Sequence, residues 1–212
     1  MEKTGTMTFL AGTPAEYKTA YPGLKELLSN TENAPSFWAE KEVMAAKEAG
    51  LVSALVDDPA YQDSTTREQF AQLIVQMITV ATGKEMESAP AGTFQDTDSE
   101  AVRKAYQAGI INGMGDGTFA PKQTMTREQM ATMIHRAISY IEKETGVKLL
   151  TKPAVIQGYT DENQVSDWAA EGMKALVANG IINGTSDTTL APQDPCTVEQ
   201  GILLLYRLYE KI

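Results

Sequence analysis

The chain has 212 residues, 42% of them hydrophobic, and a formal net charge of -10, so it can bury a sizeable core in one or two domains. The acidic balance argues against a nucleic-acid partner, because no basic field is present to displace phosphate counterions. The single cysteine, Cys196, excludes a disulfide framework or a cysteine zinc site, and no apolar run approaches the roughly 18 residues of a membrane span.

Residues 1–34 are the least regular part of the sequence. We predict short helices near residues 14–20 and 23–30 that pack on the segment that follows. The start of the chain lacks the basic and apolar regions of a signal peptide. We expect either that the protein is not exported or that an export signal has been removed.

One tetrapeptide recurs three times in the remaining sequence. Its copies are Thr66-Arg67-Glu68-Gln69, Thr126-Arg127-Glu128-Gln129 and Thr197-Val198-Glu199-Gln200. The pattern is a capping box, in which Thr accepts from the third helical amide and Gln reaches back. Apolar residues at helical spacing follow each copy. The sequence therefore predicts three amphipathic helices that begin at equivalent points.

A second helix precedes each of these. It ends at a glycine that suits a left-handed helix terminus, namely Gly50, Gly109 and Gly180. A helix–loop–helix unit thus recurs, and we place the three repeats at residues 35–83, 94–141 and 159–212. The fold class is mainly α, with short turns or minimal β structure in the loops.

The loops of the second and third repeats match each other. Residues 112–121 and 183–192 both begin with Asn-Gly, carry an Asp at the fifth position and end in Ala-Pro. Because Asn, Asp and Gly favour turns, this pattern predicts a tight turn or a very short hairpin. Asp116 and Asp187 are interpreted as turn formers, because the alternating ligands and closing Glu of an EF-hand are missing. The first repeat has lost this loop pattern.

The order of these motifs resembles that of the S-layer homology family. The second repeat is a near-complete match, the third lacks only the Arg of the tetrapeptide, and the first matches mainly at Trp38, Gly50 and residues 66–68. The motifs of the second repeat are Phe94-Gln95-Asp96, Gly109-Ile110-Ile111-Asn112-Gly113, Asp116-Gly117-Thr118-Phe119-Ala120-Pro121 and Thr126-Arg127-Glu128. The resemblance covers roughly residues 35–212.

This resemblance implies a monomeric pseudo-trimer, in which three repeats form one spindle-like bundle with grooves between neighbours. It implies a secreted protein held non-covalently on the cell wall or S-layer. The implied partner is a secondary cell-wall polymer, a peptidoglycan-linked polysaccharide that often carries pyruvylated N-acetylmannosamine. In the family, the Arg of the tetrapeptide motif contacts the acidic group of the carbohydrate, which here implies Arg67 and Arg127.

Arg67 and Arg127 also stand out on physical grounds. A cation in the first turn opposes the helix dipole and costs about 0.3–1 kcal/mol when exposed. Free helix-start amides together with a guanidinium would form a receptor for a carboxylate; the alternative is an ion pair with Asp96 or Asp161. Because Val198 replaces the Arg in the third copy, we expect at most two working grooves.

The candidate ligand-binding residues are Arg67, Arg127, Asp96, Asp161, Trp38, Trp168, Gly113 and Gly184. The two tryptophans could stack on sugar rings, or they could anchor their helices in the core. We expect His135, the single histidine, to face solvent. No catalytic residue, metal ligand or cofactor site is predicted.

Two other classes of protein remain open. The repeats could form a structural or protein-interaction module without glycan binding, as Val198 and the altered first loop suggest. A glycosidase would need two carboxylates about 5–9.5 Å apart, and the sequence singles out no such pair. We therefore predict that the chain is not an enzyme.

Overall fold

The computed structural model describes residues 34–55, 60–156 and 158–212. The short helices predicted within residues 14–30 lie outside the described residues. The described helices are α3 (Glu40–Glu48), α4 (Arg67–Thr82), α5 (Glu100–Gln107), α6 (Arg127–Thr145), the 3-10 helix η1 (Glu162–Gln164), α7 (Asp167–Ala178) and α8 (Val198–Tyr209). The β structure of this part of the chain consists of isolated bridges, so the mainly α prediction is confirmed. None of these helices is long and apolar enough to cross a membrane.

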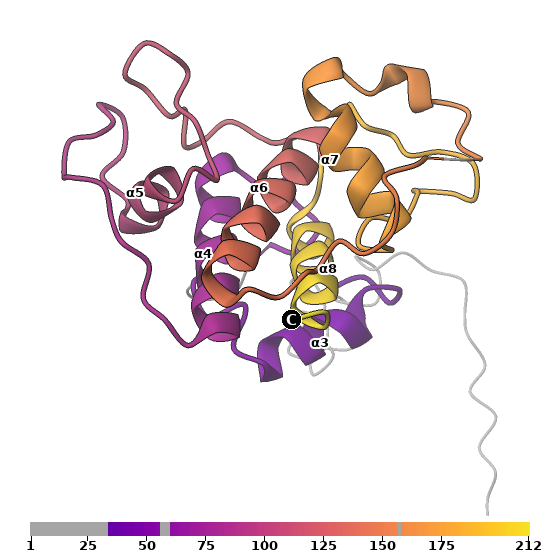
Figure 1. Ribbon diagram of the computed structural model, residues 1–212, viewed down its shortest axis with the longest axis horizontal. Helices are drawn as coiled ribbons and strands as arrows, with labels where there is room; N and C mark the ends of the chain where they lie inside the picture. The colour runs from indigo at the N-terminus through magenta and orange to yellow at the C-terminus, as the bar shows by residue number, and fades with distance from the viewer. Residues whose placement is uncertain (1–33, 56–59, 157) are drawn as a thin grey trace, which may run out of the picture. The chain divides into compact units, whose positions relative to one another are not determined.

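The helices pack in a cyclic order. We keep repeats 1, 2 and 3 for the three predicted segments, which contain α3–α4, α5–α6 and α7–α8. The first helix of each repeat packs on the second helix of the repeat before it: α5 on α4, α7 on α6, and α3 back on α8 (Figure 1). Helix α4 also contacts both α6 and α8. The first and last repeats therefore close on each other within the unit Pro35–Ile212.

A ring of three backbone hydrogen bonds marks the centre of this arrangement. The amide of Thr65 donates to the carbonyl of Cys196 (2.9 Å), that of Cys196 to Met125 (3.0 Å), and that of Met125 to Thr65 (3.0 Å). These three residues immediately precede the three capping threonines, and their side chains are buried. The second helices of all three repeats thus start from a common point.

The predicted helix ends are present. All three capping boxes are complete, with the Thr hydroxyl and the Gln side chain both in place. Gly50, Gly109 and Gly180 follow their helices with φ of 77°, 71° and 69°, the left-handed conformation that favours glycine. The third loop forms the predicted short hairpin, with a bridge between Ser186 and Thr189.

The apolar stripes of α4, α6 and α8 form the core. Burying each large aliphatic or aromatic side chain contributes about 1.5–3 kcal/mol. Gly201 of α8 is buried against α4 and α6, and a Cβ there would make ordinary van der Waals contact with the ring of Phe70 (3.4 Å) and the methyl of Met130 (3.7 Å). The helical spacing of apolar residues in repeat 3 extends to Ile212, but this residue is exposed because α8 ends at Tyr209.

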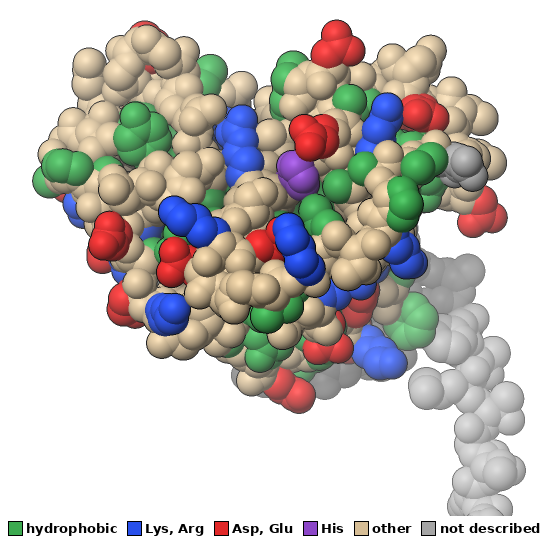
Figure 2. Space-filling model, viewed as in Figure 1, with side chains coloured by type: hydrophobic (Ala, Val, Ile, Leu, Met, Phe, Trp, Pro, Cys, Tyr) green, Lys and Arg blue, Asp and Glu red, His purple; other side chains and the backbone are tan. Residues whose placement is uncertain are grey.

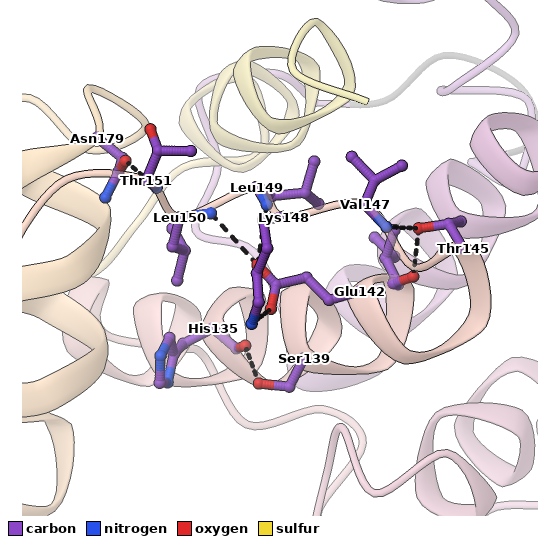
Figure 3. Close-up of polar contacts among 11 residues, drawn as sticks. His135, Ser139, Glu142, Thr145, Val147, Lys148, Leu149, Leu150, Thr151 and Asn179 are labelled. Carbon is purple, nitrogen blue, oxygen red and sulfur yellow. Dashed lines mark hydrogen bonds and ion pairs between the residues drawn. The ribbon is translucent and has the colours of Figure 1, made fainter.

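The linker between repeats 2 and 3 is fastened by two side chains. The Glu142 carboxylate of α6 accepts hydrogen bonds from the amides of Leu149 (2.9 Å) and Leu150 (3.3 Å). Asn179 Oδ1, at the end of α7, accepts from the amides of residues 151 and 152, both at 3.1 Å. The linker therefore runs from the C-terminal half of α6 to the end of α7 along a fixed path (Figure 3).

Candidate functional site

The two motif arginines join neighbouring repeats. Arg127 donates from Nε to the carbonyl of Leu190 (2.8 Å) and from Nη2 to that of Asn183 (2.9 Å). Arg67 makes the equivalent bonds to Phe119 (2.9 Å) and Asn112 (3.1 Å). Each guanidinium thus ties the second helix of one repeat to the loop of the next.

The helix-start amides are not free, so the predicted amide receptor is wrong. The amides of Arg67 and Glu68 donate to the carbonyls of Gln123 (2.9 Å) and Pro121 (3.1 Å). In repeat 2, those of Arg127 and Glu128 donate in the same way to the carbonyls of Asp194 (3.1 Å) and Pro192 (3.0 Å). The sequence showed which amides each helix leaves unpaired, but the carbonyls that accept from them come from the next repeat, more than 50 residues away in the chain.

The arginines are not held by ion pairs with the candidate aspartates among the described residues. The Arg67 guanidinium lies 4.5 Å from the centre of the Phe119 ring, a cation–π arrangement. Burial lowers the pKa of Arg67 below its ordinary value, and the charge of Asp96 offsets only part of this effect. Arg67 is half-buried and Arg127 is only 6% exposed, so Arg67 is the more accessible of the two.

Asp96 and Asp161 hold the loops in shape. Asp96 accepts from the amides of Phe119 and Ala120, both at 2.8 Å, and Asp161 accepts from the two equivalent amides of repeat 3. Ala120, with φ of 58°, lies in the left-handed region just before a proline. These carboxylates fix that strained turn, and neither lines the grooves described next.

Two grooves of the same construction lie beside the arginines. The Arg127 groove has a volume of about 550 Å³ and the Arg67 groove about 220 Å³. Each is lined by the motif Arg, an Asn-Gly pair, a Gln and an Arg on the second helix, and a Trp. These are Arg67, Asn112, Gly113, Gln129, Arg136 and Trp168 in one groove, and Arg127, Asn183, Gly184, Gln200, Arg207 and Trp38 in the other.

Both tryptophans are open to solvent, so their interpretation as core anchors is wrong. Trp38 and Trp168 are each 58% exposed and stand just before or at the start of α3 and α7. Each comes from a repeat different from those that supply the Arg and the loop. All three repeats therefore contribute to each groove, and each groove offers the face of one tryptophan to a ligand.

Gly113 and Gly184 line the grooves, and neither position has room for a side chain. A Cβ at Gly113 would lie 2.7 Å from the ring of Phe94, and one at Gly184 would lie 2.6 Å from the ring of Tyr159. These aromatic residues, Phe94 and Tyr159, are the first residues of repeats 2 and 3. The glycines allow each loop to close on its aromatic ring.

Glu128 and Glu199 have a role that the capping pattern did not predict. The Glu128 carboxylate accepts from the amide and hydroxyl of Ser166, both at 2.9 Å. Glu199 does the same for Ser36, at 2.7 and 2.8 Å. Both carboxylates are buried and dock the next repeat's first helix. A serine two positions before each Trp was the available sequence signal.

At the junction between repeats 3 and 1, Val198 stands where the other two junctions have the motif Arg, but the backbone contacts between the repeats are kept. The side chain of Val198 is 1% exposed, and its amide donates to the carbonyl of Asp63 (2.9 Å). The amide of Glu199 donates to Tyr61 (2.9 Å). The backbone contacts of the other two junctions are thus repeated here around an apolar side chain.

His135 and Cys196 are the single histidine and the single cysteine of the chain. His135 is half-buried rather than solvent-facing; a Cβ at Gly172 of α7 would lie 3.1 Å from its Cβ. Burial raises the pKa of the Cys196 thiol to about 11, so this thiol is protonated at neutral pH. Within the described part of the chain, no three acidic, His or Cys side chains are placed to hold a metal.

Positive charge on the molecule is local. On the face seen in Figure 2, Lys and Arg side chains lie among Asp and Glu side chains and form no continuous basic field. This agrees with the net charge of -10. A guanidinium inside a groove is therefore the kind of site that could hold an anionic group on this protein.

The profile of the S-layer homology domain matches residues 95–131 and 146–199. These segments belong to the S-layer homology domain family, which confirms the resemblance in repeats 2 and 3.

The chain is also similar to longer proteins. It is 33% identical to an endoglucanase of Bacillus sp. (strain KSM-635) over 153 residues, which cover 71% of this chain and 15% of that protein. It is 30% identical to a cellulosome-anchoring protein of Acetivibrio thermocellus over 125 residues, 56% of this chain and 26% of the relative. A surface-layer 125 kDa protein of Lysinibacillus sphaericus is 29% identical over 111 residues, 52% of this chain and 8% of the relative. Since enzymes and surface-layer proteins share this segment, the segment itself does not define an enzymatic activity.

Proposed function

We propose that this chain anchors a protein non-covalently to the bacterial cell surface by binding a secondary cell-wall polymer in the Arg67 and Arg127 grooves. The observation that carries the proposal is the duplication of one lining: a guanidinium, an Asn-Gly pair and a half-exposed Trp in each groove. Similarity to a cellulosome-anchoring protein and a surface-layer protein supports the same role.

The lining suits an acidic polysaccharide. An aromatic face packs against the apolar face of a sugar ring, and Asn, Gln and backbone groups bond to hydroxyls. A guanidinium adds a charge-assisted hydrogen bond to a carboxylate, such as that of a pyruvylated sugar. No catalytic step is proposed, and a monomer satisfies the proposal because both grooves form within one chain.

The direct experiment is sedimentation with purified wall sacculi from the source organism. Native sacculi should carry the protein into the pellet, whereas sacculi chemically stripped of secondary polymer should not. Replacing both tryptophans, in Trp38→Ala/Trp168→Ala, should weaken binding by about 2- to 10-fold for each ring removed. The matched control is Phe37→Ala, because Phe37 is 94% exposed beside Trp38 and lies outside the groove lining.

A structural module without glycan binding is the second candidate. It is favoured by the fact that each motif Arg already donates to two carbonyls of the neighbouring loop. On this alternative the arginines serve only to join repeats. Equal sedimentation with native and stripped sacculi would support it and would overturn the anchoring proposal.

A further inference from the structure

The two grooves differ at their second arginine. In the Arg127 groove, Arg207 forms a two-pronged ion pair with Glu42 of α3: Nε donates to Oε1 and Nη2 to Oε2, both at 2.9 Å. The two side chains are 24% and 31% exposed. The charge of Arg207 is therefore matched by a carboxylate of the same chain.

In the Arg67 groove, the equivalent Arg136 has no such partner. It is half-buried and makes no hydrogen bond or ion pair with any residue in the described part of the chain. Glu42 lies four positions after Trp38, and the residue four positions after Trp168 is Gly172. The carboxylate that neutralises the second arginine of one groove is thus missing from the other.

Both grooves are lined by two guanidiniums and by no carboxylate, although the chain as a whole carries a net charge of -10. They differ because Glu42, from outside the lining, binds the second arginine of the Arg127 groove. Arg67 is also more accessible than Arg127, which is 6% exposed. Arg136 is half-buried without an ion pair to any described residue, and it lines the same cavity as Arg67. Two guanidiniums placed in this way favour an anionic ligand.

The pair between Glu42 and Arg207 shows which anion fits. It holds a planar carboxylate against the guanidinium that corresponds to Arg136, with both oxygens bonded. A ligand carboxylate can bind Arg136 in the same way. That geometry is the two-pronged one that guanidinium groups form with carboxylates.

Building on the proposed function, we propose that the Arg67 groove receives the carboxylate of an acidic sugar, with Arg136 as a ligand beside Arg67. Glu42 already engages the equivalent arginine of the Arg127 groove, Arg207, so that this groove takes uncharged sugar units of the same polymer. The smaller groove thus recognises the acid group, and the larger one accommodates neighbouring residues of the chain.

The test is titration of the full chain with secondary polymer released from the sacculi. Arg136→Gln should weaken binding by about tenfold or more, because a charge-assisted bond is lost. The matched control is Lys143→Gln, which removes the same charge from α6 outside the Arg67 groove lining and should leave affinity within about twofold. Both variants should keep the helical circular dichroism of the unmodified chain, since Arg136 bonds to no described residue.

Two further arms complete the experiment. Glu42→Gln frees Arg207 and should raise affinity for the acidic polymer or add a second acid-dependent site. Polymer whose carboxyl groups have been chemically reduced, with phosphates left intact, should bind the unmodified chain no better than native polymer binds Arg136→Gln.

Three results would overturn the inference. If Arg136→Gln binds as tightly as the unmodified chain, or if it loses no more affinity than Lys143→Gln, Arg136 is not a ligand. Full binding of carboxyl-reduced polymer would exclude the carboxylate. Failure of the unmodified chain to bind any polymer would instead remove the proposed function, and this inference with it.

Discussion

The Nε atom of Arg127 lies 2.8 Å from the carbonyl oxygen of Leu190, across the junction between repeats 2 and 3. Arg67 makes the same contact with Phe119 across the preceding junction. A side chain that the sequence singles out as a ligand contact is therefore also a joint between repeats. Its replacement affects the fold before it affects any ligand.

We therefore predict that Arg127→Ala destabilises the protein. The change removes two charge-assisted hydrogen bonds and leaves the carbonyls of Asn183 and Leu190 without their donor, which costs about 2–3 kcal/mol. Urea unfolding followed by circular dichroism should show a lower midpoint. Arg67→Ala, at the more exposed site, should cost less. An unchanged midpoint for Arg127→Ala would show that the joint contributes nothing to stability.

The buried carboxylate of Glu128 gives a second prediction. Glu128→Ala leaves the amide and hydroxyl of Ser166 unpaired and should lower the free energy of unfolding by about 1–3 kcal/mol. Glu68 is the matched control, because it holds the same helical position in repeat 1 but its side chain makes no hydrogen bond with the described residues. Thermal unfolding of the two variants should therefore differ. Equal losses would contradict a docking role for Glu128.

Stability should also depend on pH through Asp161 and Glu142. Burial raises the pKa of Asp161, but hydrogen bonds from the amides of Leu190 and Ala191, with help from Arg127, outweigh it and place the pKa below its ordinary 3.8. For Glu142, burial is outweighed by bonds from Leu149, Lys148 and Leu150, so its pKa lies below 4.5.

The sign follows from the direction of these shifts. The unfolded chain binds protons at a higher pH than the folded chain does, so the stabilisation is fully present above about pH 5 and is lost as pH falls through the folded pKa values. Unfolding midpoints measured from pH 6 down to pH 3 should fall, and Asp161→Asn should flatten the profile. Asp187→Asn, in the exposed part of the third loop, should leave the slope as it is. A profile that rises toward low pH would contradict this assignment.

Much of the fold could be predicted because it is local. The three capping boxes, the left-handed glycines and the apolar stripes each depend on residues within about one helix of one another. The contacts that were missed depend on closure of three repeats around a common centre. No local pattern shows that the carbonyl of Pro121 will accept a hydrogen bond from the amide of Glu68, or that the carboxylate of Glu128 will accept one from Ser166.

The candidate site was predicted only in part, for the same reason. Arg67, Arg127, Trp38 and Trp168 do line grooves, but each Trp reaches its groove from another repeat. Asp96 and Asp161 were assigned to the ligand, whereas they hold loop amides. The other groove-lining arginines, Arg136 and Arg207, were not predicted, because the sequence of a helix does not show which groove its face borders.

The two tryptophans, Trp38 and Trp168, offer the most direct measurement, because the chain contains no others and each stands in one groove. Both are 58% exposed, so acrylamide should quench their fluorescence readily in the free protein. Saturating secondary cell-wall polymer should shield both, and the variants Trp38→Phe and Trp168→Phe should each report protection of the remaining ring. Quenching that is unchanged by polymer in all three proteins would contradict binding in the grooves.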